Sequence, residues 1–199
     1  TTVSYARQCA GNPAAAPAAA LVILIASTIV YVRVAIELGA VAPDLLREGA
    51  LPLAVMMTFM TVLCIGLLLK VDSRRMQPPN LENPAQIRTA IVFGILYAVI
   101  LLFVTAVREK VGQDAAIYGV AVISGLTDVD ALTLSTAELF SQGRLSGDAA
   151  WRAILIATLS NLAFKIGATA VLGGRRLAVY ALATMGVSIL FGTLLVFLW

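Results

Sequence analysis

The sequence contains no histidine and only two cysteines among its 199 residues. Imidazole and thiolate groups are the usual protein ligands of zinc and copper, so this composition argues against a site for either metal. Cys64 lies in an apolar stretch, where a cysteine acts as a small hydrophobic residue. We therefore expect neither a disulfide framework nor a thiolate metal centre.

Charge is also scarce, because only 13% of the residues are charged whereas 60% are hydrophobic. A soluble domain carries about a quarter charged residues and less than half apolar ones. One small core cannot bury this excess of apolar side chains, so a lipid bilayer is their natural solvent. We predict a single membrane domain over residues 1–199. The net charge of +3 gives no indication of a nucleic-acid partner.

The charged residues divide the chain into apolar stretches near the roughly 20 residues that a helix needs to cross a bilayer. Four stretches are free of charge, and they lie between residues 7 and 33, 48 and 70, 88 and 108, and 177 and 199. Residues 115–140 and 149–172 contain charges but are too long and apolar for loops. The sequence therefore predicts an all-α integral membrane fold of about six transmembrane helices.

Residues that are typical of helix ends mark several predicted boundaries. Asn12-Pro13 and Asn83-Pro84 each read as a cap followed by a helix-starting proline, and Gly173-Gly174 ends the fifth helix. Pro52 is expected in the first turn of the second helix, where a proline costs little.

Lysine and arginine in the loops predict the orientation. With the N-terminus inside, the cytoplasmic segments hold the excess, and the loop between residues 70 and 88 supplies four of these charges. We therefore expect both termini on the cytoplasmic side of a bacterial inner membrane. Residue 1 is a threonine rather than an initiator methionine, so we expect a processed chain or a fragment of a longer protein.

Two aspartates interrupt the predicted fourth helix. Each carboxylate near mid-bilayer costs about 2.5–3.5 kcal/mol, so Asp128 and Asp130 should face the bundle interior or a water-filled cavity. On a regular helix they point about 200° apart. A break near Ser124 and Gly125 would relieve this conflict, with Thr127 or Asp128 capping a second half-helix. The alternatives are structural salt bridges, or a helix that begins later and leaves Asp128 at an interface.

The predicted fifth helix carries a polar stripe of Thr158, Asn161, Lys165 and Thr169. These side chains lie within about 80° of one another on a helix, so they should face protein or water rather than lipid. We expect Lys165 to pair with an aspartate of the fourth helix, directly or through one water molecule. The alternative is that Lys165 extends its ammonium group to the membrane interface.

These features define a candidate ion or solute site on helices four and five. Its residues are Ser124, Thr127, Asp128, Asp130, Thr133, Asn161 and Lys165. Arg33 and Glu37 are accessory candidates, although their spacing also fits a structural i,i+4 pair. Hard oxygen ligands favour Na⁺, Mg²⁺ or a proton as the bound or coupling cation, and no organic cofactor is indicated.

The sequence has no pairing of nucleophile and base and no phosphate-binding loop, so we do not expect an enzyme. The predicted function is a membrane transporter or channel for a small ion or solute, coupled to protons or cations. The alternative is a regulatory or assembly domain whose polar core only fixes helix packing.

Two further predictions concern symmetry. Three predicted spans follow three others, so residues 18–107 and 115–199 could form a 3+3 inverted repeat, which aligns Arg33 with Asp130. Thr184, Ser188 and Gly192 form a row of small residues that allows close helix approach. On this basis we expect a homodimer.

The run SGLTDVDALTLS, from Ser124 to Ser135, resembles a signature of the uncharacterised C-terminal membrane domain of MgtC/SapB-type proteins. Glu82-Asn83-Pro84, the run SNLAFK at residues 160–165, and Arg33 are similar too. The resemblance implies a longer protein, whose MgtC-type N-terminal domain is linked with magnesium homeostasis and regulation of a membrane ATPase. That domain is absent from this sequence, and the resemblance assigns no site residue.

Overall fold

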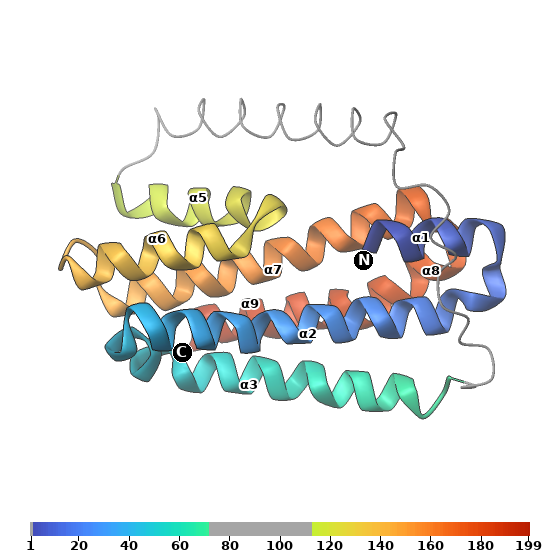
Figure 1. The fold of residues 1–199 in the computed structure, drawn as a ribbon, viewed down its shortest axis with the longest axis horizontal. Helices are drawn as coiled ribbons and strands as arrows, with labels where there is room; N and C mark the ends of the chain where they lie inside the picture. Colours follow the sequence, from blue (N-terminus) through green and yellow to red (C-terminus); the bar gives the residue numbers. More distant parts are fainter. Residues whose placement is uncertain (1, 72–112) are drawn as a thin grey trace.

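The computed structural model describes residues 2–71 and 113–199 of the chain, and all regular elements in these ranges are helical (Figure 1). In chain order they are α1 (Thr2–Gly11), η1 (Pro13–Ala15), α2 (Ala16–Val41), α3 (Pro43–Leu68), α5 (Gln113–Thr127), α6 (Val129–Ser141), α7 (Gly147–Leu172), α8 (Gly174–Ala181), the π-helical turn η3 (Leu182–Gly186) and α9 (Val187–Leu198). The predicted third span, residues 88–108, lies outside the described residues.

Within residues 2–71 and 113–199, four helical stretches are long and apolar enough to cross a membrane, which indicates an integral membrane protein. They are Pro13–Val41, Pro43–Leu68, Gly147–Leu172 and Gly174–Leu198. A helix of 26 residues, such as α7, is about 39 Å long and exceeds the hydrocarbon core of about 30 Å. The first, second, fifth and sixth predicted spans are thereby confirmed as long apolar helices.

The predicted helix boundaries at Asn12-Pro13 and Gly173-Gly174 are confirmed, and Asn83-Pro84 lies outside the described residues. The Asn12 side chain accepts a hydrogen bond from the Ala14 amide at 3.2 Å, and Gly173 follows the last residue of α7. The prediction for Pro52 was wrong. Helix α3 begins earlier than expected, at Pro43, whose fixed φ suits the first turn of a helix. Pro52 consequently lies well inside the helix.

The predicted fourth transmembrane helix was wrong, because residues 113–141 form a helical hairpin. Val122 and Gly125 of α5 contact Ser160 and Asn161 of α7 in the same chain order, so α5 runs parallel to α7. Only residues 142–146 separate α6 from α7, and α6 runs back antiparallel to it (Figure 1). With 15 and 13 residues, neither α5 nor α6 is long enough to span a bilayer alone.

The hairpin packs on α7 through a close backbone approach. A Cβ atom added at Gly125 would overlap the backbone of Ala157, near the middle of α7. Ala121 and Leu132, from the two arms of the hairpin, cluster with Ala153 and Ala157. The hairpin tip therefore lies about half-way along α7.

The remaining core joins α2, α3, α7 and α9, which lie side by side in Figure 1. Leu24, Met56 and Ile154 are fully buried in it. The small residues of the last span belong to this core, since Ser188 is 0% exposed and Leu159 occupies the space beside Gly192. The row of Thr184, Ser188 and Gly192 therefore faces helices of the same chain and does not support a dimer contact. The homodimer stays a prediction.

The two ends of the described chain lie at opposite ends of α7. The Ala6 backbone in α1 lies close to Gly173, after the end of α7, whereas Arg152 near its start donates to the Val196 carbonyl of α9 at 3.3 Å. The expectation that both termini lie on the cytoplasmic side stays a prediction. The inverted repeat is not confirmed either, since α2 is one continuous helix and residues 113–141 are a hairpin.

Substitution of Gly125 should test the packing of the hairpin. Gly125→Ala should destabilise the protein by about 1–3 kcal/mol, because the added methyl group overlaps rigid backbone. The matched control is Gly119→Ala on the same helix, where an added Cβ meets nothing within 4 Å. The control should change stability by less than about 1 kcal/mol, in the stabilising direction. Thermal unfolding in mild detergent compares the two variants, and equal midpoints would contradict the packing described above.

Candidate functional site

The tip of the hairpin is built around Asp128. Its backbone is extended (φ −149°, ψ 114°), its amide donates to the Ser124 carbonyl at 2.6 Å, and its carboxylate accepts from the Asp130 amide at 3.0 Å. The Thr127 hydroxyl donates to the same Ser124 carbonyl at 3.0 Å. The helix break thus falls one residue after the predicted segment, and the prediction that Asp128 caps a second helix is confirmed.

Side chains of α7 satisfy backbone carbonyls in the last turns of α5. The Asn161 amide donates to the Gly125 carbonyl at 3.0 Å, and the Ser160 hydroxyl donates to the Val122 carbonyl. The Gly125 carbonyl is one of the last four of α5, which lack intrahelical partners and in a bilayer must be satisfied within the protein. Asn161 and Ser160 therefore contact the end of α5, and Ser160 was not among the predicted site residues; a role of Asn161 in binding a solute stays a prediction.

Asp130 pairs with Arg33 of α2. The Arg33 guanidinium contacts the Asp130 carboxylate and also lies 3.7 Å from a carboxylate oxygen of Glu37, one turn further along α2. Both carboxylate side chains are largely buried, with exposed fractions of 20% and 19%. The second Glu37 oxygen is buried and has no hydrogen-bond partner within the described ranges. One guanidinium thus lies between two carboxylates, and this triad carries one excess negative charge.

The prediction that both aspartates face the interior holds only for Asp130. Asp128 is exposed, because its carboxylate turns back to cap α6 at the outer side of the tip. Thr133 is fully buried, and its hydroxyl donates to the Val129 carbonyl of its own helix at 2.9 Å. Its hydroxyl therefore binds within the first turn of α6.

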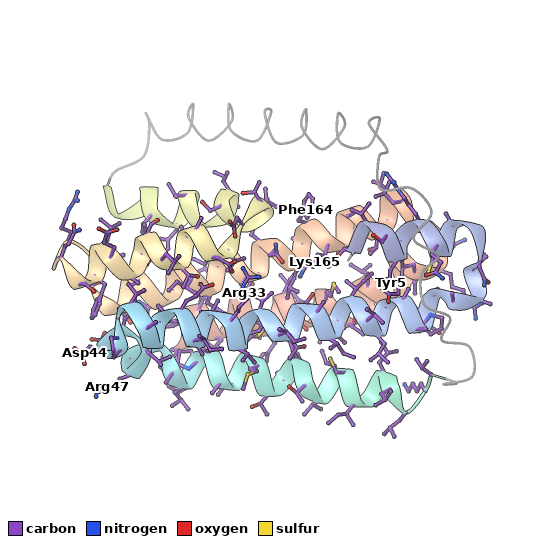
Figure 2. The ribbon with its side chains drawn as sticks, in the orientation of Figure 1. Tyr5, Arg33, Asp44, Arg47, Phe164 and Lys165 are labelled. Carbon is purple, nitrogen blue, oxygen red and sulfur yellow. The ribbon has the colours of Figure 1, made fainter. Side chains whose placement is uncertain are left out.

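Lys165 points across the bundle to α2 (Figure 2). Its ammonium donates to the Ser27 hydroxyl at 2.9 Å, and Ser27 donates in turn to the Ile23 carbonyl at 2.7 Å. No direct Lys165–aspartate pair occurs among the ion pairs of the described residues, because Arg33 contacts Asp130 instead. The direct pairing was therefore wrong, and a contact through one water molecule stays a prediction. The interfacial alternative does not fit a nitrogen bound to a buried serine.

Tyr31 lies one turn from Ser27 and belongs to the same polar contact between α2 and α7. It is 2% exposed and faces Thr158, whose own hydroxyl donates to the Leu155 carbonyl at 2.7 Å. Within the described part of the chain, the Tyr31 hydroxyl forms no hydrogen bond of normal geometry. We call Ser27, Tyr31, Thr158 and Lys165 the α2–α7 polar seam.

Ser27 and Tyr31, which form the α2 half of this seam, were not predicted as site residues, although their spacing makes them neighbours on one helical face. The α7 half was predicted correctly, since Thr158 and Thr169 are 3% and 0% exposed and the stripe faces protein.

A profile of the family described as a domain of unknown function, DUF4010, matches residues 1–173. The chain belongs to this family. An uncharacterised protein of Aquifex aeolicus (strain VF5) is 32% identical over 120 residues, which are 60% of this chain and 52% of that protein. The match thus spans about half of the relative's length. No solved structure matches the chain significantly. These findings agree with an uncharacterised membrane domain, and the MgtC/SapB association stays an expectation.

The charged residues of the site do not form a ready metal cluster. Within residues 2–71 and 113–199, no three cysteine, aspartate or glutamate side chains gather closely enough to hold a metal ion. Asp130 and Glu37 share a guanidinium, which repels a divalent cation. The arrangement suits a proton or a monovalent cation better than Mg²⁺.

A double-mutant cycle should measure the Arg33–Asp130 contact. Because the Arg33 side chain is 58% exposed, we expect a coupling energy of about 1–2 kcal/mol for Arg33→Gln and Asp130→Asn, below the value for fully buried pairs. The matched control is Arg47–Asp44, whose side chains are 81% and 77% exposed and whose coupling should stay below about 0.5 kcal/mol. Unfolding in mixed micelles gives both values, and equal coupling in the two pairs would contradict a special role for Arg33.

Proposed function

We propose that the chain is a membrane transporter or channel for a small ion or solute, coupled to a proton or a monovalent cation. The observation that carries this proposal is a helical hairpin whose charged tip lies about half-way along the spanning helix α7. Discontinuous helices near mid-membrane are typical of transport sites, because half-helix ends offer unpaired backbone dipoles to ions. Backbone irregularity at this depth is tolerated only against protein or a water-filled cavity.

The Asp130–Arg33–Glu37 triad supplies the coupling group of this proposal. Its excess negative charge inside a bundle favours the uptake of a proton or a monovalent cation. Uptake at either carboxylate weakens its hold on Arg33, because the guanidinium then has one anionic partner instead of two. The triad thus gives two arrangements of the α2–α6 contact that differ by one bound cation. No enzymatic step is part of the proposal.

In this proposal the hairpin enters and leaves the membrane on the side of the α2–α3 turn. The N-terminal helix, Lys70, Arg175 and Arg176 then belong to the opposite side, which we propose is cytoplasmic because lysine and arginine accumulate there. The C-terminal end of α9 consequently lies on the non-cytoplasmic side of an inner membrane.

A regulatory or assembly domain without transport is the second candidate. The pairing of Asp130 with Arg33 favours it, since a neutralised carboxylate can serve packing alone. Flux measurements separate the two candidates.

Purified protein in liposomes should dissipate an imposed H⁺ or Na⁺ gradient faster than protein-free liposomes, as read by an internal dye. Asp130→Asn should lower the rate by about tenfold or more, because the triad loses its excess charge. Asp44→Asn is the control, since Asp44 is exposed in the first turn of α3 and pairs only with Arg47 among the described residues. Rates equal to those of protein-free liposomes for both cations would overturn transport and leave the assembly role.

Water access to the tip provides a separate test. Thr127 is exposed at the tip, so Thr127→Cys in a chain with Cys9→Ser and Cys64→Ser should react with a membrane-impermeant thiol reagent. Leu190→Cys, at an exposed apolar position of α9, is the control and should react at least about tenfold more slowly, because a thiol in lipid does not ionise. Equal rates in sealed vesicles would contradict a water-filled approach to the hairpin.

A further inference from the structure

The ammonium group of Lys165 has more N–H donors than the described hydrogen bond uses. It carries three N–H groups, and its hydrogen bond within the described residues goes to the neutral Ser27 hydroxyl. No carboxylate of the described residues lies within ion-pair distance of its nitrogen, since the aspartate and glutamate of the triad contact Arg33 instead. A cation inside a membrane bundle without an anionic partner is costly, and the cost is relieved when an anion binds it.

The Tyr31 hydroxyl is a second, independent donor on the same seam. It is buried, with 2% exposure, and has no partner of normal geometry in the described part of the structure. Ser27 and Tyr31 are one turn apart on α2, and they face Thr158 and Lys165, two turns apart on one face of α7. Lys165 contacts α2 at Ser27, and Tyr31 contacts α7 at Thr158, one turn further along α2.

We propose that the α2–α7 polar seam binds a small monovalent anion, either a halide ion or the carboxylate group of a solute, between the Lys165 ammonium and the Tyr31 hydroxyl. The anion supplies the negative charge that Lys165 lacks, and it offers Tyr31 a charged acceptor in place of the neutral Thr158 hydroxyl. A cation is disfavoured at this place because the ammonium repels it. The inference rests on the proposed function and names its substrate class, an anion that moves together with the cation of the triad.

The seam adjoins the hairpin tip, which makes such coupling physically direct. Asn161, one turn from Lys165 on α7, binds the Gly125 carbonyl of the tip at 3.0 Å. Successive turns of α7 therefore carry a group of the seam and a group that holds the tip, and we expect an anion at Lys165 and a cation near the tip to favour each other's binding.

Anion binding can be measured without flux, through thermal unfolding of the full chain in a non-ionic detergent. Sodium chloride and sodium formate are titrated in separate arms at constant sodium concentration, with sodium sulfate, whose anion is divalent and carries no carboxylate, as the balance. A saturable rise in the unfolding midpoint is expected in at least one arm. The chloride arm alone responds if the ligand is a halide, and the formate arm responds if it is a carboxylate.

Variants locate the site. Tyr31→Phe removes one oxygen and should weaken the apparent affinity by about tenfold, the value of a hydrogen bond to a charged group. Lys165→Met should abolish the response. Tyr180→Phe on α8 is the matched control and should leave the affinity unchanged, since Tyr180 lies outside the seam. If Lys165→Met does not fold, Tyr31→Phe decides the question.

Two results would overturn the proposal. One is that the unfolding midpoint shows no saturable rise in either arm. The other is that Tyr31→Phe and Lys165→Met leave the apparent affinity unchanged, which would indicate a general salt effect. Binding without flux in liposomes would keep the anion site and remove its transport role. Flux without anion binding would keep the proposed function and overturn the seam as a site.

Discussion

Backbone polar groups at the hairpin tip must find hydrogen-bond partners inside the bundle, and the rest of the site depends on this requirement. The chain reverses at one extended residue, Asp128, which ends one helix and begins another at mid-depth. Asn161 and Ser160 bind carbonyls of the first helix, and Asp128 itself binds an amide of the second. These contacts are only within reach because Gly125 lets the two backbones meet at Ala157.

The position of the charges follows from this packing. Once α5 covers α7, α6 returns beside α2, and Asp130 meets Arg33 rather than Lys165. Lys165 consequently faces the other polar side of α2, where Ser27 accepts its hydrogen bond. The two cations of the site therefore have different partners, although the sequence alone offers both of them the same aspartates.

The sequence alone predicted which residues of the site are polar or charged and near which residue the helix breaks. It did not predict which side chains these residues contact. The stripe on α7, the break near Asp128 and its capping role follow from helical periodicity and from the cost of charge in lipid, which are local properties. The reversal at Asp128 does not follow, because a kinked spanning helix and a hairpin have the same apolar pattern and differ in the φ and ψ of one residue. The partners of Lys165 and Asp130 depended on that reversal, so an incorrect fourth span also gave an incorrect ion pair.

Helix α2 connects the two polar regions. Ser27 and Tyr31 face α7, whereas Arg33 points about 200° away from Tyr31 on the helix and contacts α6. A shift of α6 relative to α7 must therefore break the Arg33 contact, break the Lys165 contact, or rotate α2 so that both change together. Packed helices have discrete arrangements rather than a continuum, because their interiors are close-packed. Under the proposed function, we therefore expect a change of charge at the triad to reach the polar seam through α2.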